Sequence, residues 1–224
     1  MVSPEGASSA AESIALGGHV GTHIDALCHF SCGGKLFGGH EAAVVQSYDG
    51  GLRKWPVDGV RPIFRRGVML DVAGVVGVEE LAEDFKVTPE HLEVAEAHGG
   101  VKVGAGDVVL LRTGWARYWG DAARFIRAQK GGAVHGPGPE LAGAKWLSAR
   151  KVFAAGSDTI AFERVPAANM PVHVHLLVES GIHIMEALNL EEAARERFYE
   201  FLFIAAPLKI RGGTGAPVRA FAAV

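Results

Sequence analysis

Cysteine is scarce in this chain: its 224 residues include only Cys28 and Cys32. Their four-residue spacing matches no redox or zinc signature, and two cysteines cannot build the disulfide framework of a small secreted protein. Cys28, beside His29, is expected to be a small buried apolar residue rather than a metal ligand. This cysteine usage predicts a reducing, cytoplasmic setting.

The chain also lacks long apolar runs and a charge of one dominant sign. The 22 Lys and Arg and the 25 Asp and Glu are interspersed and leave a formal net charge of −3, so there is no basic field for nucleic acid. No apolar run reaches transmembrane length, and the first residues, MVSPEGASSAAES, lack the basic and hydrophobic regions of a signal peptide. A small-molecule substrate is expected, with neither nucleic acid nor a membrane as partner.

Short apolar runs alternate with amphipathic segments along the chain, which predicts one mixed α/β domain with no repeat or linker. Thr88 and Pro89 are typical of a helix start, and Gly99 and Gly100 of its end near His98. Pro207 interrupts an apolar run, which suggests an edge strand or a bulge. The expected strands are 22–26, 68–72, 108–111, 152–155, 182–187, 201–210 and 218–222, and the expected helices are 89–98, 139–150, 171–180 and 190–198.

One segment, GGHVGTHIDALCHF, places three imidazoles and a carboxylate within eleven residues: His19, His23, Asp25 and His29. On a strand, His23 and Asp25 project to the same face, and Gly21 allows the backbone to bend and bring His19 to the same point. The alternative is a polar strand end with ordinary half-buried histidines, but four such groups together favour a site. Imidazole and carboxylate are ligands shared by zinc, manganese and iron, and the spacing is not that of a zinc finger.

The pattern HxGTHxDxxxH, here His19, Gly21, Thr22, His23, Asp25 and His29, resembles the signature of the cyclase family of metal-dependent hydrolases, which includes bacterial kynurenine formamidases and isatin hydrolases. The family often has Pro where this chain has Leu27. Further segments are similar in order along the chain: GDVVLLRTGW (106–115), GSDTIAFE (156–163), PVHVHLLVESGIHIMEALNL (171–190) and APLKIRGGTGAPVRAFA (206–222).

The resemblance implies a swivelling β/β/α-type fold, a mixed barrel-like sheet surrounded by helices, assembled as a homodimer or homotetramer. Family members commonly carry a longer N-terminal segment with an Asp-Leu-Ser-His-like strand. We therefore expect residues 1–18 to be a short segment, either truncated or naturally lacking that strand, ahead of a single domain over 19–224.

The resemblance also implies a divalent metal, Mn or Zn, as one or two ions. His19, His23 and Asp25 would be ligands, and the motif GIHIME adds Glu186 together with a later histidine. That histidine is expected to be His173, with His175 as the alternative. On a helix the two point about 200° apart and cannot both face one metal. Glu186, in an apolar strand, needs a partner for its buried charge in any case.

These residues predict hydrolysis of a C–N amide bond, in an aryl formamide or a cyclic amide, or of an ester, through a metal-activated water. His29 would act as general acid and base. Two alternatives remain: a metal-dependent lyase or cyclase acting on a small carbonyl substrate, and a non-catalytic metal-binding family member.

Three further residues are weaker candidates. Trp115 is a candidate substrate-pocket wall, although large aromatics are more often core. Arg112 is a candidate partner for a substrate carboxylate, or else an ion-pair partner of Asp107 or Glu163. Asp158, just beyond an expected strand, either has a functional role or caps a turn.

Overall fold

The computed structural model describes residues 4, 6–126 and 133–224, and within them seven strands close into a mixed barrel. The barrel order is β1 (His23–Asp25), β11 (Gly215–Ala223), β10 (Glu200–Pro207), β4 (Ile63–Asp71), β6 (Val108–Arg112), β8 (Ala154–Ser157) and β9 (His183–Glu186). The neighbours β4–β6–β8–β9 are parallel, and the other pairs of the barrel are antiparallel. The expected α/β fold with a mixed barrel-like sheet is confirmed.

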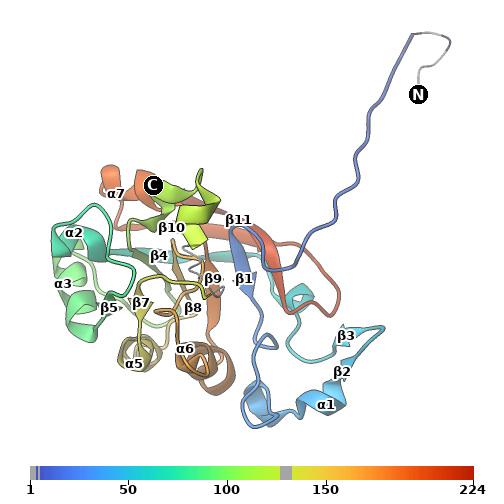
Figure 1. Cartoon of the computed structure of the whole chain (residues 1–224), viewed down its shortest axis with the longest axis horizontal. Coiled ribbons are helices and arrows are strands. Elements are labelled where there is room, and N and C mark those ends of the chain that lie inside the picture. The colour runs from blue at the N-terminus through green and yellow to red at the C-terminus, as the bar shows by residue number, and fades with distance from the viewer. Residues whose placement is uncertain (1–3, 5, 127–132) are drawn as a thin grey trace.

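Helices cover the parallel side of the barrel. α3 (Pro89–Gly99), α5 (Leu141–Ala149) and α6 (Pro171–His173) lie in a row, and α6 continues as a π-helix over Val174–Ser180 (Figure 1). The smaller elements are α1 (Ala42–Val45), β2 (Gln46–Ser47), β3 (Gly51–Leu52), α2 (Val72–Val76), β5 (Lys86–Val87), α4 (Ala122–Ile126), β7 (Gly138–Pro139) and α7 (Glu191–Arg195), with 3-10 turns at Phe37–Gly39, Val57–Gly59 and Trp115–Tyr118.

Alternate residues of the barrel strands serve two cores, because strand side chains alternate between faces. On β4, Val68 and Leu70 pack in the core beneath the helices, whereas Met69 packs in the second core with Leu110 and Phe203. Both faces of the parallel strands are thus buried, which accounts for their continuous apolar character.

Two sequence expectations need correction. The strand predicted over 68–72 begins at Ile63, because antiparallel pairing with β10 extends it through Arg65 and Arg66, and Val72 already starts α2. Pro207 does not mark an edge strand, since β10 lies inside the closed barrel. It is the last residue of β10, opposite Val218, where the strand ends.

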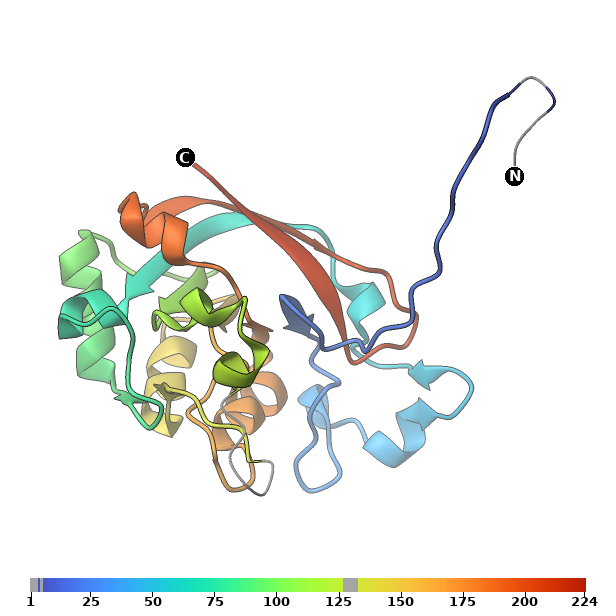
Figure 2. The same ribbon diagram turned by 45° about the horizontal axis from the view of Figure 1, so that its top comes forward.

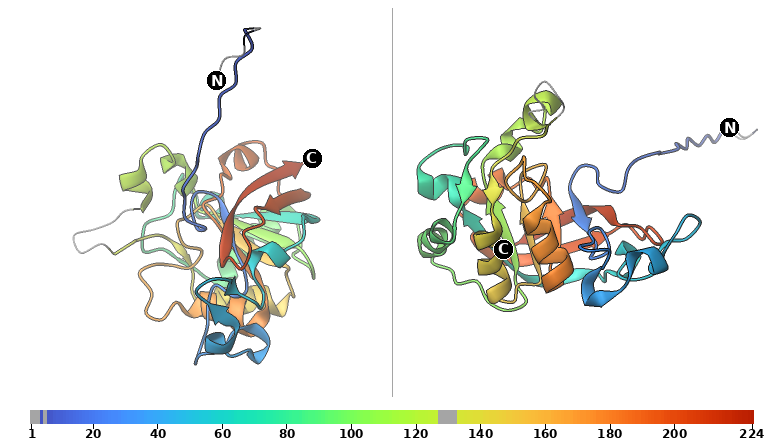
Figure 3. Two further views of the ribbon diagram at one scale, coloured as in Figure 1. Left: turned by 90° about the vertical axis from the view of Figure 1, so that its right-hand side faces the viewer. Right: turned by 60° about the horizontal axis from the view of Figure 1, so that its bottom comes forward.

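The N-terminal residues 6–17 are exposed and extend away from the barrel in all views (Figures 2 and 3). β10 and β11 form a long antiparallel pair over one side of the molecule (Figure 2). Among the described residues, no helix is long and apolar enough to span a membrane.

Candidate metal centre

Strand register brings the two predicted clusters together. β1 carries His23 and Asp25 and pairs on one side with β9, where His23 lies directly opposite Glu186. α6, following a long connection from β8, brings His173 to the same place, with its Nε2 3.3 Å from Glu186 Oε1. Residues more than 140 positions apart in sequence therefore share one buried site.

Asp25 lies at the middle of this site. It is 1% exposed, and neither carboxylate oxygen has a hydrogen-bond partner. Yet three imidazole nitrogens surround it: His19 Nδ1 lies 2.8 Å and His23 Nε2 3.7 Å from Oδ1, and His173 Nε2 lies 3.8 Å from Oδ2. A buried carboxylate with no backbone or hydroxyl donor is costly, whereas a carboxylate facing several imidazoles suits a divalent cation.

The donor atoms form two overlapping groups that share Asp25. One contains His19, Asp25 and His29, and the other Asp25, His173 and Glu186; within each group the candidate ligand atoms lie within 4.8 Å of one another. His23 is outside both groups, but its Nε2 lies 3.3 Å from Glu186 Oε2. His29, which the sequence predicts to carry a proton, lies among the candidate ligands themselves. The centre of its ring is 4.1 Å from that of the His19 ring.

His19, His23 and His173 each contact a second partner outside the donor groups. His23 Nδ1 donates to the Gly21 carbonyl at 2.8 Å, and His173 Nδ1 to Glu163 Oε1 at 2.7 Å. A carbonyl and a carboxylate only accept, so both rings donate through Nδ1 and turn Nε2 toward the carboxylates, where Nε2 holds a proton in the metal-free protein and can bind a metal once that proton is lost. His19 Nε2 contacts Thr214 Oγ1 at 2.9 Å.

Glu163 is the residue that the sequence reasoning missed. It is buried, and besides holding the His173 ring it accepts the His173 backbone N–H at 3.0 Å. The available signal was its position at the end of GSDTIAFE, where a carboxylate follows an apolar pair and needs a buried partner.

Opposing effects set the protonation of the site. Burial works to lower the pKa of His173, but hydrogen bonds to Glu163 and Glu186 outweigh it and raise that pKa to about 10. Burial would raise the pKa of Glu186, yet hydrogen bonds from His173 and His23 lower it to about 2. Burial lowers the pKa of His29, helped by the nearby His19 and His173.

The backbone around the site is strained at two non-glycine residues. Met170, just before α6, has φ 46°, and Ala187, just after Glu186, has φ 53°. Thr22 Oγ1 donates to the Ala187 carbonyl at 2.6 Å and so ties this turn to β1. Left-handed backbone at such residues persists only where surrounding contacts enforce it, and it is concentrated at functional sites.

His175 and His183 do not join the donor groups. His175 faces away, with Nε2 2.8 Å from Ser148 Oγ and Nδ1 2.7 Å from Glu179 Oε2. His183 Nδ1 donates to the backbone carbonyl of Asp25 at 3.0 Å. Of the two alternatives for the later histidine, the structure therefore brings His173 to the centre.

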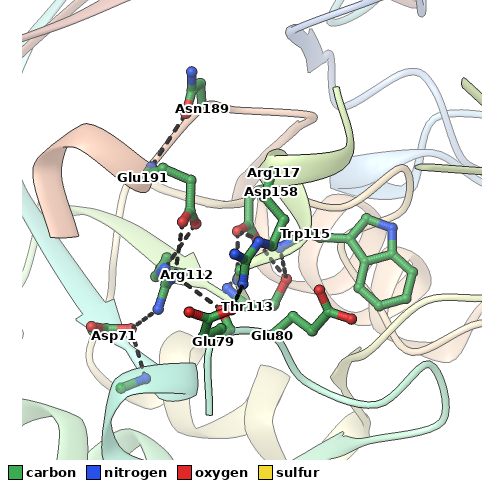
Figure 4. A network of polar contacts seen from close by, with 12 residues as sticks. Asp71, Glu79, Glu80, Arg112, Thr113, Trp115, Arg117, Asp158, Asn189 and Glu191 are labelled. Atoms are coloured by element: carbon green, nitrogen blue, oxygen red, sulfur yellow. Dashed lines mark hydrogen bonds and ion pairs between the residues drawn. The ribbon is translucent and has the colours of Figure 1, made fainter. Parts of the chain in front are cut away.

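Arg112 and Trp115 belong to a different part of the molecule, a network of polar contacts around the end of β6 (Figure 4). Arg112 Nε and Nη2 donate to Glu191, and Nη1 donates to Asp71 Oδ1 at 3.1 Å. The sequence suggested Asp107 or Glu163 as the ion-pair partner, and neither is among these partners. Trp115 is fully buried, and its indole N–H donates to the Phe125 carbonyl at 2.8 Å, which makes it a core residue rather than a pocket wall.

Asp158 serves the turn after β6. Its Oδ1 accepts the Thr113 N–H and hydroxyl, and its Oδ2 accepts the N–H groups of Gly114 and Trp115 (Figure 4). Of the two expected roles, the structure shows the turn cap.

The Cyclase family model matches residues 3–164. The chain belongs to the cyclase family. An isatin hydrolase from Roseibium aggregatum is 30% identical over 213 residues, which cover 93% of this chain and 73% of that protein.

Solved structures agree with this membership. A structure described as a novel cyclase superposes with a TM-score of 0.79 at 32% identity, covering 91% of this chain and 69% of that one. An isatin hydrolase bound to the product analogue thioisatinate superposes with a TM-score of 0.71 at 28% identity, covering 92% and 72%.

Proposed function

We propose that this protein is a divalent-metal-dependent hydrolase that cleaves the C–N bond of a small aromatic amide, either a cyclic amide or an aryl formamide, or a related ester. The observation that carries the proposal is Asp25: a buried carboxylate with no backbone or hydroxyl donor, shared by two groups of imidazole and carboxylate ligand atoms. The isatin hydrolase relative supports the substrate class.

His19, His23, Asp25, His173 and Glu186 would hold the metal, as one or two ions of Mn or Zn. The donor set of imidazole nitrogen and carboxylate oxygen suits both metals. When bound, the ion would supply an activated water and a positive charge beside the scissile carbonyl. The hydrogen bonds from His23 to Gly21 and from His173 to Glu163 direct the free ring nitrogens inward before any ion arrives.

His29 would move the proton. Its ring stands beside that of His19 and 6.4 Å from that of His173, so it borders the donors without an orienting carboxylate of its own. As a new C–O bond forms at the carbonyl carbon, His29 takes the proton of the attacking water. It returns that proton to the nitrogen as the C–N bond breaks, which leaves an amine and a carboxylic acid. The acid releases its remaining proton to solvent and becomes a carboxylate.

The site opens to solvent on the side of His19. The His19 side chain is 28% exposed, whereas those of Asp25 and His173 are 1% and 4% exposed. A substrate would approach past His19 and His29, with Phe30 beside them, since its ring lies 5.2 Å from that of His29 and 5.0 Å from that of His173. This aromatic neighbour suits an aryl substrate.

The test is turnover of isatin, an N-formyl aryl amine and an aryl ester before chelation, after chelation and after add-back of Mn or Zn. We expect chelation to abolish activity, metal to restore it, and product formed in heavy-oxygen water to carry one labelled oxygen. Product without label would indicate a lyase, and turnover that survives complete metal removal would overturn the proposal.

A variant assigns the role of His29. We expect His29→Ala to retain bound metal but lose at least about 100-fold in kcat, the usual scale of general acid–base catalysis. The matched control is His98→Ala, which removes a surface histidine whose partner is the Tyr199 hydroxyl. Loss of metal from His29→Ala would instead make His29 a ligand.

A further inference from the structure

A separate cavity of about 660 Å³ lies at the start of β4, outside the metal centre. Its lining comes from residues 55–56 and 59–62, the first residues of β4, Phe153 just before β8, His183 of β9, and Leu27 after β1. We propose that this cavity binds a small aromatic carboxylate. The proposal does not depend on the hydrolase assignment.

Aromatic rings form the walls. Trp55, Phe64 and Phe153 line the cavity, and Phe64 and Trp55 are 66% and 44% exposed. Large apolar side chains gathered around one hollow are typical of a site for a flat apolar group, and the cavity volume falls within the range of small-molecule pockets.

Trp55 is held in an unfavourable backbone conformation at this cavity. Its φ is 58°, a value that a bulky side chain rarely adopts. Its indole N–H donates to the Phe37 carbonyl at 3.0 Å, and its ring lies 5.5 Å from that of Phe37. The fold thus enforces strain to place an indole at the edge of the cavity, which points to a binding role.

The charge of the cavity is positive and uncompensated. Arg61 and Arg65 line it, and no Asp or Glu does. The Arg65 guanidinium stacks 4.0 Å above the Phe153 ring and donates one N–H to the Gly106 carbonyl. By contrast, the adjacent Arg66 is paired with Asp107 and Glu200.

Arg61 has no hydrogen bond or ion pair with any described residue. Two guanidinium groups beside aromatic walls match a carboxylate attached to a ring, because Arg binds carboxylates with paired N–H donors. A cationic or neutral aromatic ligand would leave both guanidinium charges without a negative partner.

The cavity is distinct from the metal centre. The two sites share two chain segments but no candidate ligand: His183 lines the cavity and donates to the backbone carbonyl of Asp25, and Leu27, two residues after Asp25, lines the cavity as well. The Asp25 side chain itself faces the histidines. Binding at the cavity should therefore survive a variant that destroys the metal centre.

Calorimetric titration of the purified protein with benzoate tests the proposal, with benzamide as the uncharged isostere. We expect saturable benzoate binding with one site per chain, at least tenfold tighter than benzamide. Arg61→Ala and Arg65→Ala should each weaken benzoate binding about tenfold, whereas Arg53→Ala should not. Arg53 is an exposed neighbour that bonds the Val44 carbonyl and does not line the cavity.

The variant Asp25→Asn distinguishes benzoate binding at the cavity from benzoate binding at the metal centre. It should bind benzoate as tightly as the unaltered protein. Loss of benzoate binding in Asp25→Asn would assign it to the metal centre and overturn the proposal. Equal affinity for benzoate and benzamide, no effect of either arginine variant, or no saturable binding would overturn it as well. Arg61 has no described partner to lose, so its variant is expected to fold normally.

Discussion

Asp25 is the residue on which the metal centre depends, and its role follows from what it lacks. Burial without a backbone or hydroxyl donor would be destabilising in a carboxylate with no cation nearby, and imidazole nitrogens of His19 and His173 lie 2.8 and 3.8 Å from its oxygens. The residues next to it in sequence could be predicted as ligands, because their geometry is local: alternation on β1 and a bend at Gly21, whose φ is 60°.

Glu163 could not be predicted in the same way. Its contact with His173 spans ten residues and depends on the path of the chain between β8 and α6. The same limit applies to Arg112, whose partners Asp71 and Glu191 lie on other elements and became visible only in the barrel.

Removing the Glu163 charge tests its orienting role. We expect Glu163→Gln to weaken metal affinity 10- to 100-fold, the usual effect of losing a carboxylate that orients a metal-bound histidine. Glu179→Gln is the matched control, since Glu179 bonds His175 at the same 2.7 Å but outside the centre. Competition with a chelating dye measures both; equal affinities in the two variants would contradict the role of Glu163.

A methyl group at Gly215 should displace His19. A Cβ there would lie 2.4 Å from His19 Cε1 and 2.8 Å from its Nε2. Because small displacements of site groups cost about 100-fold in rate, we expect Gly215→Ala to lower kcat/KM by about that factor. Gly120→Ala is the control, because a Cβ there meets nothing within 4 Å. Unchanged kcat/KM in Gly215→Ala would show that the His19 position is unimportant.

At the scale of elements, the sequence predicts features that neighbouring residues decide, such as helix ends, but not features that depend on pairing with a distant strand. α3 begins after Thr88 and ends before Gly100, whose φ is 63°, because capping is decided by neighbouring residues. The early start of β4 at Ile63 depends on β10, about 140 positions later, and no local pattern reveals it. Pro207 suggests an edge strand because a proline cannot donate a hydrogen bond to a neighbouring strand. The sequence of one strand does not show that the barrel closes around it.

The turn after β6 depends on Asp158. Asp158→Ala would leave the buried N–H groups of Thr113 and Gly114 and the Thr113 hydroxyl without their acceptor, so we expect it to lower the free energy of unfolding by about 3 kcal/mol or more. The Trp115 N–H would keep only its longer bond to Thr113 Oγ1, at 3.3 Å. Urea denaturation measures this. The control Asp121→Ala removes an exposed bond to the Arg124 N–H and should cost about 1 kcal/mol. Similar losses in both variants would contradict the importance assigned to the turn.

At the scale of the whole molecule, protonation and metal binding are linked. Without metal, His173 has a pKa raised to about 10, so its protonated form contributes stability that is fully present below about pH 6.5 and lost as the pH rises toward 10. A metal ion needs the neutral ring, so binding must release that proton.

We therefore expect Mn or Zn to raise the Tm more at pH 8.5 than at pH 6.5, and metal addition to acidify a weakly buffered solution. His173→Gln should remove most of this pH dependence, while His175→Gln should preserve it, because His175 faces Ser148 and Glu179. A metal-induced Tm shift that is independent of pH would contradict a protonated His173 in the metal-free protein.

The barrel joins β1, β9 and α6 so that a motif near residue 25 meets one near residue 180, and the metal centre exists only in this closed arrangement. Its direct test is anomalous diffraction from crystals grown with Mn or Zn, recorded at the absorption edge of the metal. We predict a peak bonded to the Asp25 carboxylate and flanked by His19, His173 and Glu186. A fully metal-loaded protein whose peaks all lie away from Asp25 would contradict the metal centre described above.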